Sequence, residues 1–191
     1  LQERDGVART NDLVRILNVA PGTITNTVER LEKESFIVHE PYRGVRLTEK
    51  GRKIALRTVR KHRLSERLLT DILNVEWGKA HDVACQLEHG ISDEVAEKIE
   101  KTLGHPKTCP HGNPIPTEGG AIVEDSTRPL SKLNTGEKGT VVKIADESTE
   151  LLQYIHDLGL EPGKSLGIIE KAPFDGPVTI VIDGKERALS R

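Results

Sequence analysis

The stretch TNDLVRILNVAPGTITNTVERLEKESFI, residues 10–37, decides the fold of the N-terminal part of this chain. Apolar residues in its first half recur at close to helical spacing, which predicts a helix over residues 10–19. The link VAPG follows, and Pro21 suits the first turn of a second helix. Apolar residues from Ile24 to Leu31 then form one helical stripe. Two helices joined by a tight turn, the second with polar residues at its start, are typical of a helix-turn-helix.

A hairpin is predicted directly after the second helix. Residues 36–39 and 45–47 have the composition of short strands, and Pro41 and Gly44 between them favour a turn. A hairpin in this position indicates a winged helix. Three side chains at or near its tip suit contacts with a phosphate backbone or a minor groove: Tyr42, Arg43 and Arg46.

Base contacts are expected from the start of the second helix, where the side chains are short and polar. These side chains are Thr23, Thr25, Asn26 and Thr27. None is an arginine able to bind guanine bidentately, so thymine methyl contacts and DNA shape would supply much of the specificity. The alternative is that these residues form ordinary exposed helix surface.

Charge is divided unevenly along the 191 residues, although the net charge is only −2. Residues 1–70 carry 15 Lys and Arg against 9 Asp and Glu, a net charge of +6, and the remainder carries 13 against 21, a net charge of −8. A basic N-terminal part suggests a polyanionic partner, although solvated helix faces would give the same counts. No apolar run approaches the ~20 residues that cross a bilayer, so we expect a cytoplasmic protein without a membrane partner. The chain contains no Met, from which we expect that a segment before Leu1 is missing.

Three further helices are predicted, over residues 48–73, 76–90 and 92–104, and their apolar faces suit a dimer interface. The second contains HDVACQLEH, residues 81–89, which crowds metal-ligand types into nine positions. At 100° per residue, three of these side chains share about 100° of helix arc: Cys85, Glu88 and His89.

The spacing in this segment indicates two metal sites rather than one. His81 and His89 are about 12 Å apart along a helix, whereas ligands of one ion lie within roughly 4–5 Å. His81 therefore needs other partners, and His62 and Glu66, four residues apart on the preceding helix, supply them. Mixed thiolate, imidazole and carboxylate ligands suit Fe²⁺, Co²⁺, Ni²⁺ or Zn²⁺. The alternatives are solvated surface residues and, for Cys85, a buried thiol without a metal.

Two cysteines, Cys85 and Cys109, are too few for a disulfide scaffold. They could pair, but free or metal-bound thiolates in a reducing cytoplasm are the preferred prediction. Cys109 and His111, in CPHG, form a second and weaker pair of soft ligands.

The C-terminal part is predicted to be a small β-barrel of about five strands. Residues 105–120 are rich in Pro and Gly and irregular, and a polar stretch follows. Four segments then read as short strands, with a helix between the first two: 139–144, 165–170, 178–183 and 185–190. No motif of a zinc hydrolase, a zinc deaminase or a phosphate-binding loop occurs, so we expect that the protein is not an enzyme.

The chain resembles the diphtheria toxin repressor family of iron-dependent regulators. The resemblance rests on RKHRLSERLLTDIL (60–73), HDVACQLEHGISDEV (81–95) and CPHGNPIP (109–116), behind the winged helix, and it weakens after residue 130. It implies a mainly α fold with small β parts. The implied domains are a winged helix-turn-helix at residues 1–57, whose first helix precedes Leu1, and a helical metal-binding and dimerisation domain at residues 58–120. A linker at residues 121–133 and an SH3-like β-barrel at residues 134–191 follow.

The same resemblance implies an iron(II)-activated homodimer that binds palindromic double-stranded operator DNA and represses iron-uptake genes. Fe²⁺ would fill two sites per subunit, and Mn²⁺, Co²⁺, Ni²⁺ or Zn²⁺ could replace it. The iron branch of the family has Cys where the manganese branch has a carboxylate, so Cys85 favours iron. The alternatives are a manganese-responsive regulator of the same family and a DNA-binding protein with structural zinc.

Site residues carry over from the family as follows. The implied primary metal site is Cys85, Glu88 and His89, completed in the family by a Met that would precede Leu1. The implied ancillary site is His62, Glu66 and His81, with Asp146, Glu147 and Glu150 as possible further ligands from the barrel. An anion is expected near the ancillary metal, held by Arg63 and Asn113.

Overall fold

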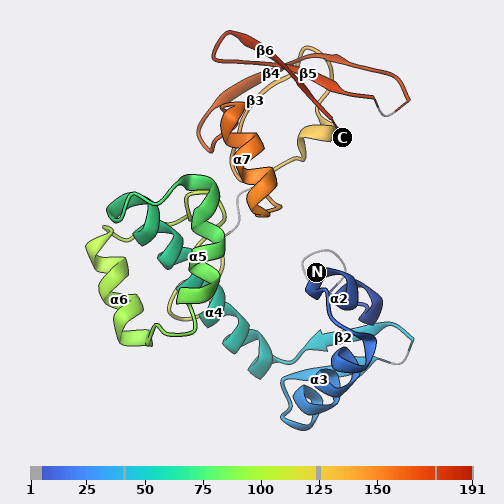
Figure 1. Ribbon diagram of the computed structural model, residues 1–191, viewed down its shortest axis with the longest axis vertical. Coiled ribbons are helices and arrows are strands. Elements are labelled where there is room, and N and C mark those ends of the chain that lie inside the picture. The colour runs from blue at the N-terminus through green and yellow to red at the C-terminus, as the bar shows by residue number, and fades with distance from the viewer. Residues whose placement is uncertain (1–5, 41, 124–125, 175, 191) are drawn as a thin grey trace. The chain divides into compact units, whose positions relative to one another are not determined.

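A computed structural model of the chain describes residues 6–40, 42–123, 126–174 and 176–190. The chain divides into two compact units, Leu1–Arg57 and Thr58–Arg191 (Figure 1). No helix in the described part of the chain is both long enough and apolar enough to cross a membrane.

The first unit is a winged helix-turn-helix, as predicted. Its elements are α2 (Thr10–Leu17), α3 (Pro21–Lys33), β1 (Ile37–Glu40), β2 (Gly44–Leu47) and the start of α4 (Glu49–Arg67). Helix α2 ends two residues earlier than predicted, because Asn18 adopts a left-handed conformation at φ 49°. The predicted turn residue Pro41 lies outside the described residues.

The wing is a two-stranded antiparallel sheet, with Ile37 opposite Leu47 and Glu40 opposite Gly44. Ala8 forms an additional antiparallel bridge to Val45. A side chain could not fit at Gly44, since a Cβ there would lie 2.2 Å from the carbonyl oxygen of Ala8 and φ is 129°. Gly44 therefore allows the N-terminal segment to lie against the wing.

The second unit begins with a helical part. Helix α4 continues as a π-helical turn (Leu68–Ile72) and is followed by a 3-10 turn (Trp77–Lys79), α5 (Ala80–Leu87) and α6 (Asp93–Thr102). The Ser92 hydroxyl accepts a hydrogen bond from the backbone N–H of Val95 at 3.2 Å and so caps α6. The core of this part consists of Leu64, Ile91, Ala96, Ile99 and Ile115.

The C-terminal part is an antiparallel sheet with one helix. The sheet has the order β3–β4–β5–β6, and α7 lies between β3 and β4 in the chain. The bounds are β3 (Lys138–Thr140), α7 (Thr149–Asp157), β4 (Ser165–Lys171), β5 (Val178–Ile182) and β6 (Lys185–Leu189). The strand predicted over residues 139–144 is shorter, because its last residues pack against the CPHGN loop instead: the Ile144 N–H donates to the His111 carbonyl oxygen at 2.9 Å.

Candidate metal centre

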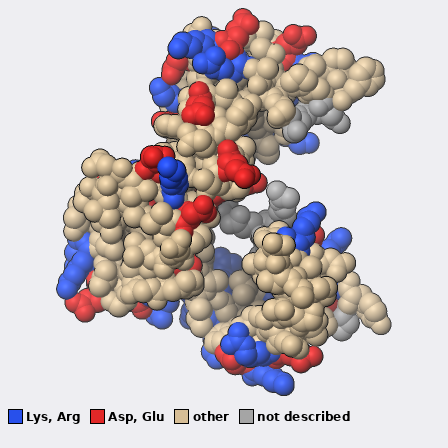
Figure 2. All heavy atoms as spheres, in the orientation of Figure 1, with Lys and Arg blue, Asp and Glu red and all other residues tan. Residues whose placement is uncertain are grey.

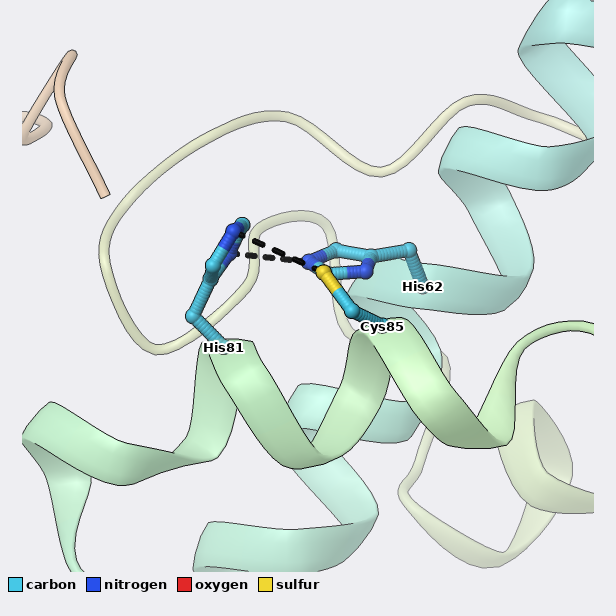
Figure 3. Close-up of side chains that lie close together, drawn as sticks. All are labelled: His62, His81 and Cys85. Atoms are coloured by element: carbon cyan, nitrogen blue, oxygen red, sulfur yellow. Dashed lines mark hydrogen bonds between the residues drawn. The ribbon is translucent and has the colours of Figure 1, made fainter. Parts of the chain in front are cut away.

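Two histidines and a cysteine meet where α4 passes α5 (Figure 3). His62 projects from α4, and His81 and Cys85 project from successive turns of α5. The His62 Nε2 atom lies 3.1 Å from the His81 Nδ1 atom, and the Cys85 Sγ atom lies 3.7 Å from the His81 Nε2 atom. The helical spacing places His81 and Cys85 on one face of α5, as predicted.

Glu66 lies at the middle of this cluster and is fully buried. Its Oε1 atom is 3.1 Å from His62 Nε2, 3.2 Å from His81 Nδ1 and 3.3 Å from His111 Nδ1. Burial alone would raise the pKa of this carboxyl, but hydrogen bonds from the histidines outweigh burial and hold its pKa well below its usual range. Its Oε2 atom is buried without a hydrogen-bond partner. Glu66 is therefore an ionised carboxylate with one oxygen free to bind a cation.

Glu147 reaches the cluster from the segment before α7. Its Oε1 atom accepts a hydrogen bond of 2.7 Å from the Asn113 side-chain amide and lies 3.4 Å from His111 Nδ1. Its Oε2 atom lies 3.7 Å from His81 Nδ1. Of the three barrel residues predicted as possible ligands, Glu147 is the one that the structure brings to the cluster. Asp146 accepts from the Ser148 N–H, and Glu150 lies in the first turn of α7.

Cys109 and His111 complete the cluster from the opposite side, and both are buried. The Cys109 Sγ atom lies 3.8 Å from Glu147 Oε1. Burial raises the pKa of the Cys109 thiol to about 11, so this side chain is a neutral thiol unless a metal ion displaces its proton. The sequence pattern CPHG indicated these two ligands only weakly, and their proximity to Glu66 was not predicted.

Three sets of donor atoms in the described residues lie within 4.8 Å of one another. The sets are His62, His81 and Cys85; then His62, Glu66, His81 and Glu147; and finally Glu66, Cys109, His111 and Glu147. Nitrogen, sulfur and carboxylate oxygen donors at this density suit a first-row transition metal. The predicted ancillary trio lies within the second set.

The structure does not bring the predicted primary trio together. Helix α5 ends at Leu87, so Glu88 and His89 lie beyond its last turn. The Glu88 Oε2 atom is 2.8 Å from His62 Nδ1, and the exposed His89 ring lies 3.4 Å from the other Glu88 oxygen. Cys85 is associated with His81 instead.

Three arginines on α4 hold the loop that carries Cys109 and His111. Each donates to a backbone carbonyl of the loop: Arg60 to Pro116 at 2.9 Å, Arg67 to Thr108 at 2.9 Å, and Arg63 to Pro114. Their spacing of three and four residues puts the three guanidinium groups in one row along the helix. Of the predicted anion ligands, Arg63 is thus hydrogen-bonded to the loop, and Asn113 donates to Glu147 and to the Ile144 carbonyl.

The predicted DNA contacts lie on the first unit. Thr23, Thr25 and Asn26 are exposed in the first turns of α3, and Thr27 is half-buried. Tyr42 is fully exposed at the wing. The wing residues Arg43 and Arg46 both form ion pairs with Glu40, at 3.3 and 3.2 Å. Figure 2 shows Lys and Arg side chains interspersed with Asp and Glu side chains on the face drawn.

Family models match the three parts of the chain in order. Residues 1–45 match the iron dependent repressor N-terminal DNA binding domain, residues 48–117 match the iron dependent repressor metal binding and dimerisation domain, and residues 128–191 match the FeoA domain. The chain is also 36% identical over 177 residues to the iron-dependent repressor IdeR of Mycobacterium tuberculosis H37Rv, across 86% of this chain and 76% of that protein.

This chain belongs to the iron-dependent repressor family.

The repressor is also 32% identical over 181 residues to the diphtheria toxin repressor of Corynebacterium diphtheriae, across 87% of this chain and 77% of that protein. A structure described as a manganese-dependent transcriptional repressor complex with manganese superposes with a TM-score of 0.89 at 32% identity, covering 96% of the repressor and 86% of that chain. The structure of IdeR from T. acidophilum gives a TM-score of 0.82 at 28% identity, covering 98% and 86%. These relatives establish a metal-dependent transcriptional repressor with a winged-helix, a helical and an SH3-like part.

Proposed function

We propose that this repressor is an iron(II)-activated homodimer that binds palindromic operator DNA and represses iron-uptake genes. The observation that carries the proposal is the buried Glu66 carboxylate, surrounded by histidines and with one oxygen unpaired, in a chain of this family. A divalent cation would neutralise that charge and bind donors from separate segments together. The cation stabilises the conformation that it binds most tightly, which is the one that brings these donors close together.

The metal-binding residues are assigned as follows. His62, Glu66 and His81 form the ancillary site, and Glu147 adds a ligand from the C-terminal part; the contacts described above support this set. Cys85, Glu88 and His89 are assigned to the primary site, for which Glu88 must release His62, its present partner at 2.8 Å.

Cys85 supports iron as the signal, because a thiolate is a soft ligand that suits Fe²⁺ better than Mn²⁺. Manganese is the second candidate, since the manganese-dependent repressor structure superposes with a TM-score of 0.89. Affinity order alone does not decide between them, because Zn²⁺ and Ni²⁺ bind such donors more tightly than either.

DNA recognition is assigned to the first unit. Thr23, Thr25, Asn26 and Thr27 would meet base edges from the start of α3, and Tyr42, Arg43 and Arg46 would contact the backbone from the wing. Exposed ion pairs such as those of Arg43 and Arg46 with Glu40 contribute little to stability, so these arginines can exchange Glu40 for phosphate at small cost. A near-palindromic operator matches a twofold-symmetric dimer.

Metal and DNA are linked through α4. This helix starts in the DNA-binding unit at Glu49 and carries His62 and Glu66 in the second unit. If metal favours the DNA-binding conformation, operator DNA must tighten metal binding by the same factor. The coupling expected for such a system is about 1–3 kcal/mol, or roughly 5–150-fold in operator affinity.

The test is anaerobic fluorescence anisotropy of the full chain on a labelled operator at fixed salt, titrated with Fe²⁺, Mn²⁺ or Zn²⁺. We expect binding that requires metal, that is reversed by chelator and that appears at lower Fe²⁺ than Mn²⁺ concentration. Cys85→Ala should abolish the metal response, whereas Gln86→Ala, an exposed neighbour, should leave it intact. A response to Mn²⁺ first would identify a manganese regulator, and binding that ignores both metal and chelator would indicate structural zinc.

A further inference from the structure

A cavity of about 450 Å³ lies beside the loop that follows α6. Its walls include Thr108 and Gly112 from this loop and Val142 and Lys143 from the segment between β3 and α7. All of its lining residues belong to the second unit. Cavities of roughly 300–1,000 Å³ are the size that binds small organic molecules in proteins.

The loop wall of this cavity is fixed in shape without any ligand. The arginines of α4 described above donate to three carbonyls of the loop, and the acceptor residues Thr108, Pro114 and Pro116 all line the cavity. A backbone hydrogen bond of 2.8 Å from the Ile115 N–H to the Lys107 carbonyl closes the base of the loop. A preformed wall lowers the cost of ordering that a ligand must overcome.

The walls carry an excess of positive charge. Three Lys and Arg side chains line the cavity, Arg60, Lys107 and Lys143, against two carboxylates, Glu100 and Glu118. Arg60 and Glu100 pair with each other at 2.7 Å. Within the part of the chain that the structure describes, the ammonium groups of Lys107 and Lys143 have neither a hydrogen bond nor an ion pair, and Lys143 is half-buried. Hollows with such an excess concentrate ligands of the opposite charge.

Much of the remaining wall is apolar. The apolar lining residues are Pro106, Pro114, Ile115, Pro116, Val123 and Val142. A mainly apolar wall with a few charged groups suits a ligand that has an apolar body and one acidic group. Arg63 and Asn113, the anion ligands predicted from the sequence, do not line the cavity, and their side chains donate elsewhere.

We propose that this cavity binds a small organic anion, with an apolar body and one carboxylate or phosphate group, as a second effector of the repressor. Lys107 and Lys143 bind the acidic group, and the proline and valine side chains contact the body. The binding site stands independently of the proposed metal-responsive function, whereas the effector role rests on that function.

The effector role follows from what the two walls carry. The loop wall holds Cys109 and His111, whose side chains face the metal cluster. The other wall is joined to it, because the Ile144 N–H donates to the His111 carbonyl at 2.9 Å and a Cβ at Gly112 would lie 2.0 Å from the Val142 carbonyl oxygen. A ligand that contacts both walls stabilises the arrangement that also brings the metal donors together. Anion and metal therefore tighten each other's binding by the same factor.

The first test is fluorescence titration of the metal-free full chain with anilinonaphthalene sulfonate, an apolar anion, and with uncharged anilinonaphthalene. Lys107→Gln and Lys143→Gln should each weaken sulfonate binding about fivefold, as expected for the loss of one unit charge at contact distance in water, and leave the uncharged dye unaffected. Lys185→Gln, an exposed lysine on β6, is the matched control and should change neither. Val142→Trp fills the cavity without a change of charge and should weaken both dyes.

No bound sulfonate in the wild type, or wild-type affinity in the Lys107→Gln Lys143→Gln double variant, would overturn the site. Displacement of the dye by hexanoate or by hexyl phosphate identifies the preferred acid, and displacement by hexanol at the same concentration would contradict anion selectivity.

Repeating the titration with Zn²⁺ bound tests the effector role. We expect the dissociation constant of the sulfonate to fall at least about fivefold. An unchanged constant would overturn the effector role. Because dye binding is first measured without metal or DNA, failure of the cavity proposal is distinguishable from failure of metal-dependent operator binding, which anisotropy reports.

Discussion

Removing Arg60 should destabilise the second unit by about 3 kcal/mol. Arg60 is 7% exposed, and its guanidinium binds Glu100 on α6 bidentately, with Nη1 3.2 Å from Oε1 and Nη2 2.7 Å from Oε2. It also donates to the buried Pro116 carbonyl at 2.9 Å. Arg60 therefore connects α4 to both α6 and the loop of Cys109.

The magnitude follows from what Arg60→Ala leaves unpaired. The Pro116 carbonyl loses its donor in a buried position, which costs about 1–3 kcal/mol. Breaking a fully buried ion pair costs roughly 3–5 kcal/mol, but the Glu100 side chain is 22% exposed and water can hydrate it, so only part of that cost applies. Arg60→Lys keeps the charge without the bidentate geometry and should lose about half as much.

Urea unfolding followed by Trp77 fluorescence measures this effect, because Trp77 is the only tryptophan and lies in the second unit. With a slope of about 2 kcal/mol per molar urea, Arg60→Ala should lower the midpoint by roughly 1.5 M. Arg57→Ala, an exposed arginine one turn earlier, is the matched control and should shift it little. A midpoint for Arg60→Ala within error of the control would refute the reasoning.

Acid provides a second check on the same pair. The hydrogen bond from Arg60 is the main cause that lowers the pKa of Glu100. The pair therefore stabilises the fold above the unfolded-state pKa of about 4.5, and this stability is lost as pH falls through the lower folded pKa. Arg60→Ala should remove this part of the acid dependence.

Three further outcomes are expected. Gly112→Ala should lower the melting temperature by several degrees and weaken metal binding, since a Cβ there would lie 2.0 Å from the Val142 carbonyl oxygen and φ is 86°. Differential scanning calorimetry and metal titration test this prediction, and wild-type values in both would contradict it. Leu64→Ala should cost about 2–5 kcal/mol by urea unfolding, because Leu64 is fully buried in the helical core, and a loss below 1 kcal/mol would contradict that packing. Burial lowers the pKa of His62, but its contacts with Glu66 outweigh burial and raise it. In the metal-free protein, protonated His62 therefore stabilises the fold below pH 6.5, and this stabilisation is lost as pH rises through the folded pKa, whereas metal binding strengthens over the same range. The increase in melting temperature caused by metal should therefore grow from about pH 6 to about pH 8, and a constant increase would argue against these ligands.

Local sequence patterns determined the helix-turn-helix, the wing and the pairing of His62 with Glu66. Each depends on backbone periodicity or on a turn residue, which acts over a few positions and is legible without the rest of the fold. The family resemblance assigned the same two residues, His62 and Glu66, to the ancillary metal site. It also suggested ligands from residues 146–150 without singling out Glu147.

Only the tertiary structure decided how the cluster is completed. Cys109 and Glu147 are 38 residues apart, and Arg63 reaches a carbonyl 51 residues away, through a loop without periodicity. The same packing turned Glu88 toward His62 and ended α5 at Leu87, although the pattern predicted a helix to residue 90. These contacts depend on which buried donors and acceptors find partners across the fold, a requirement that spans distant segments and leaves no local signature in the sequence.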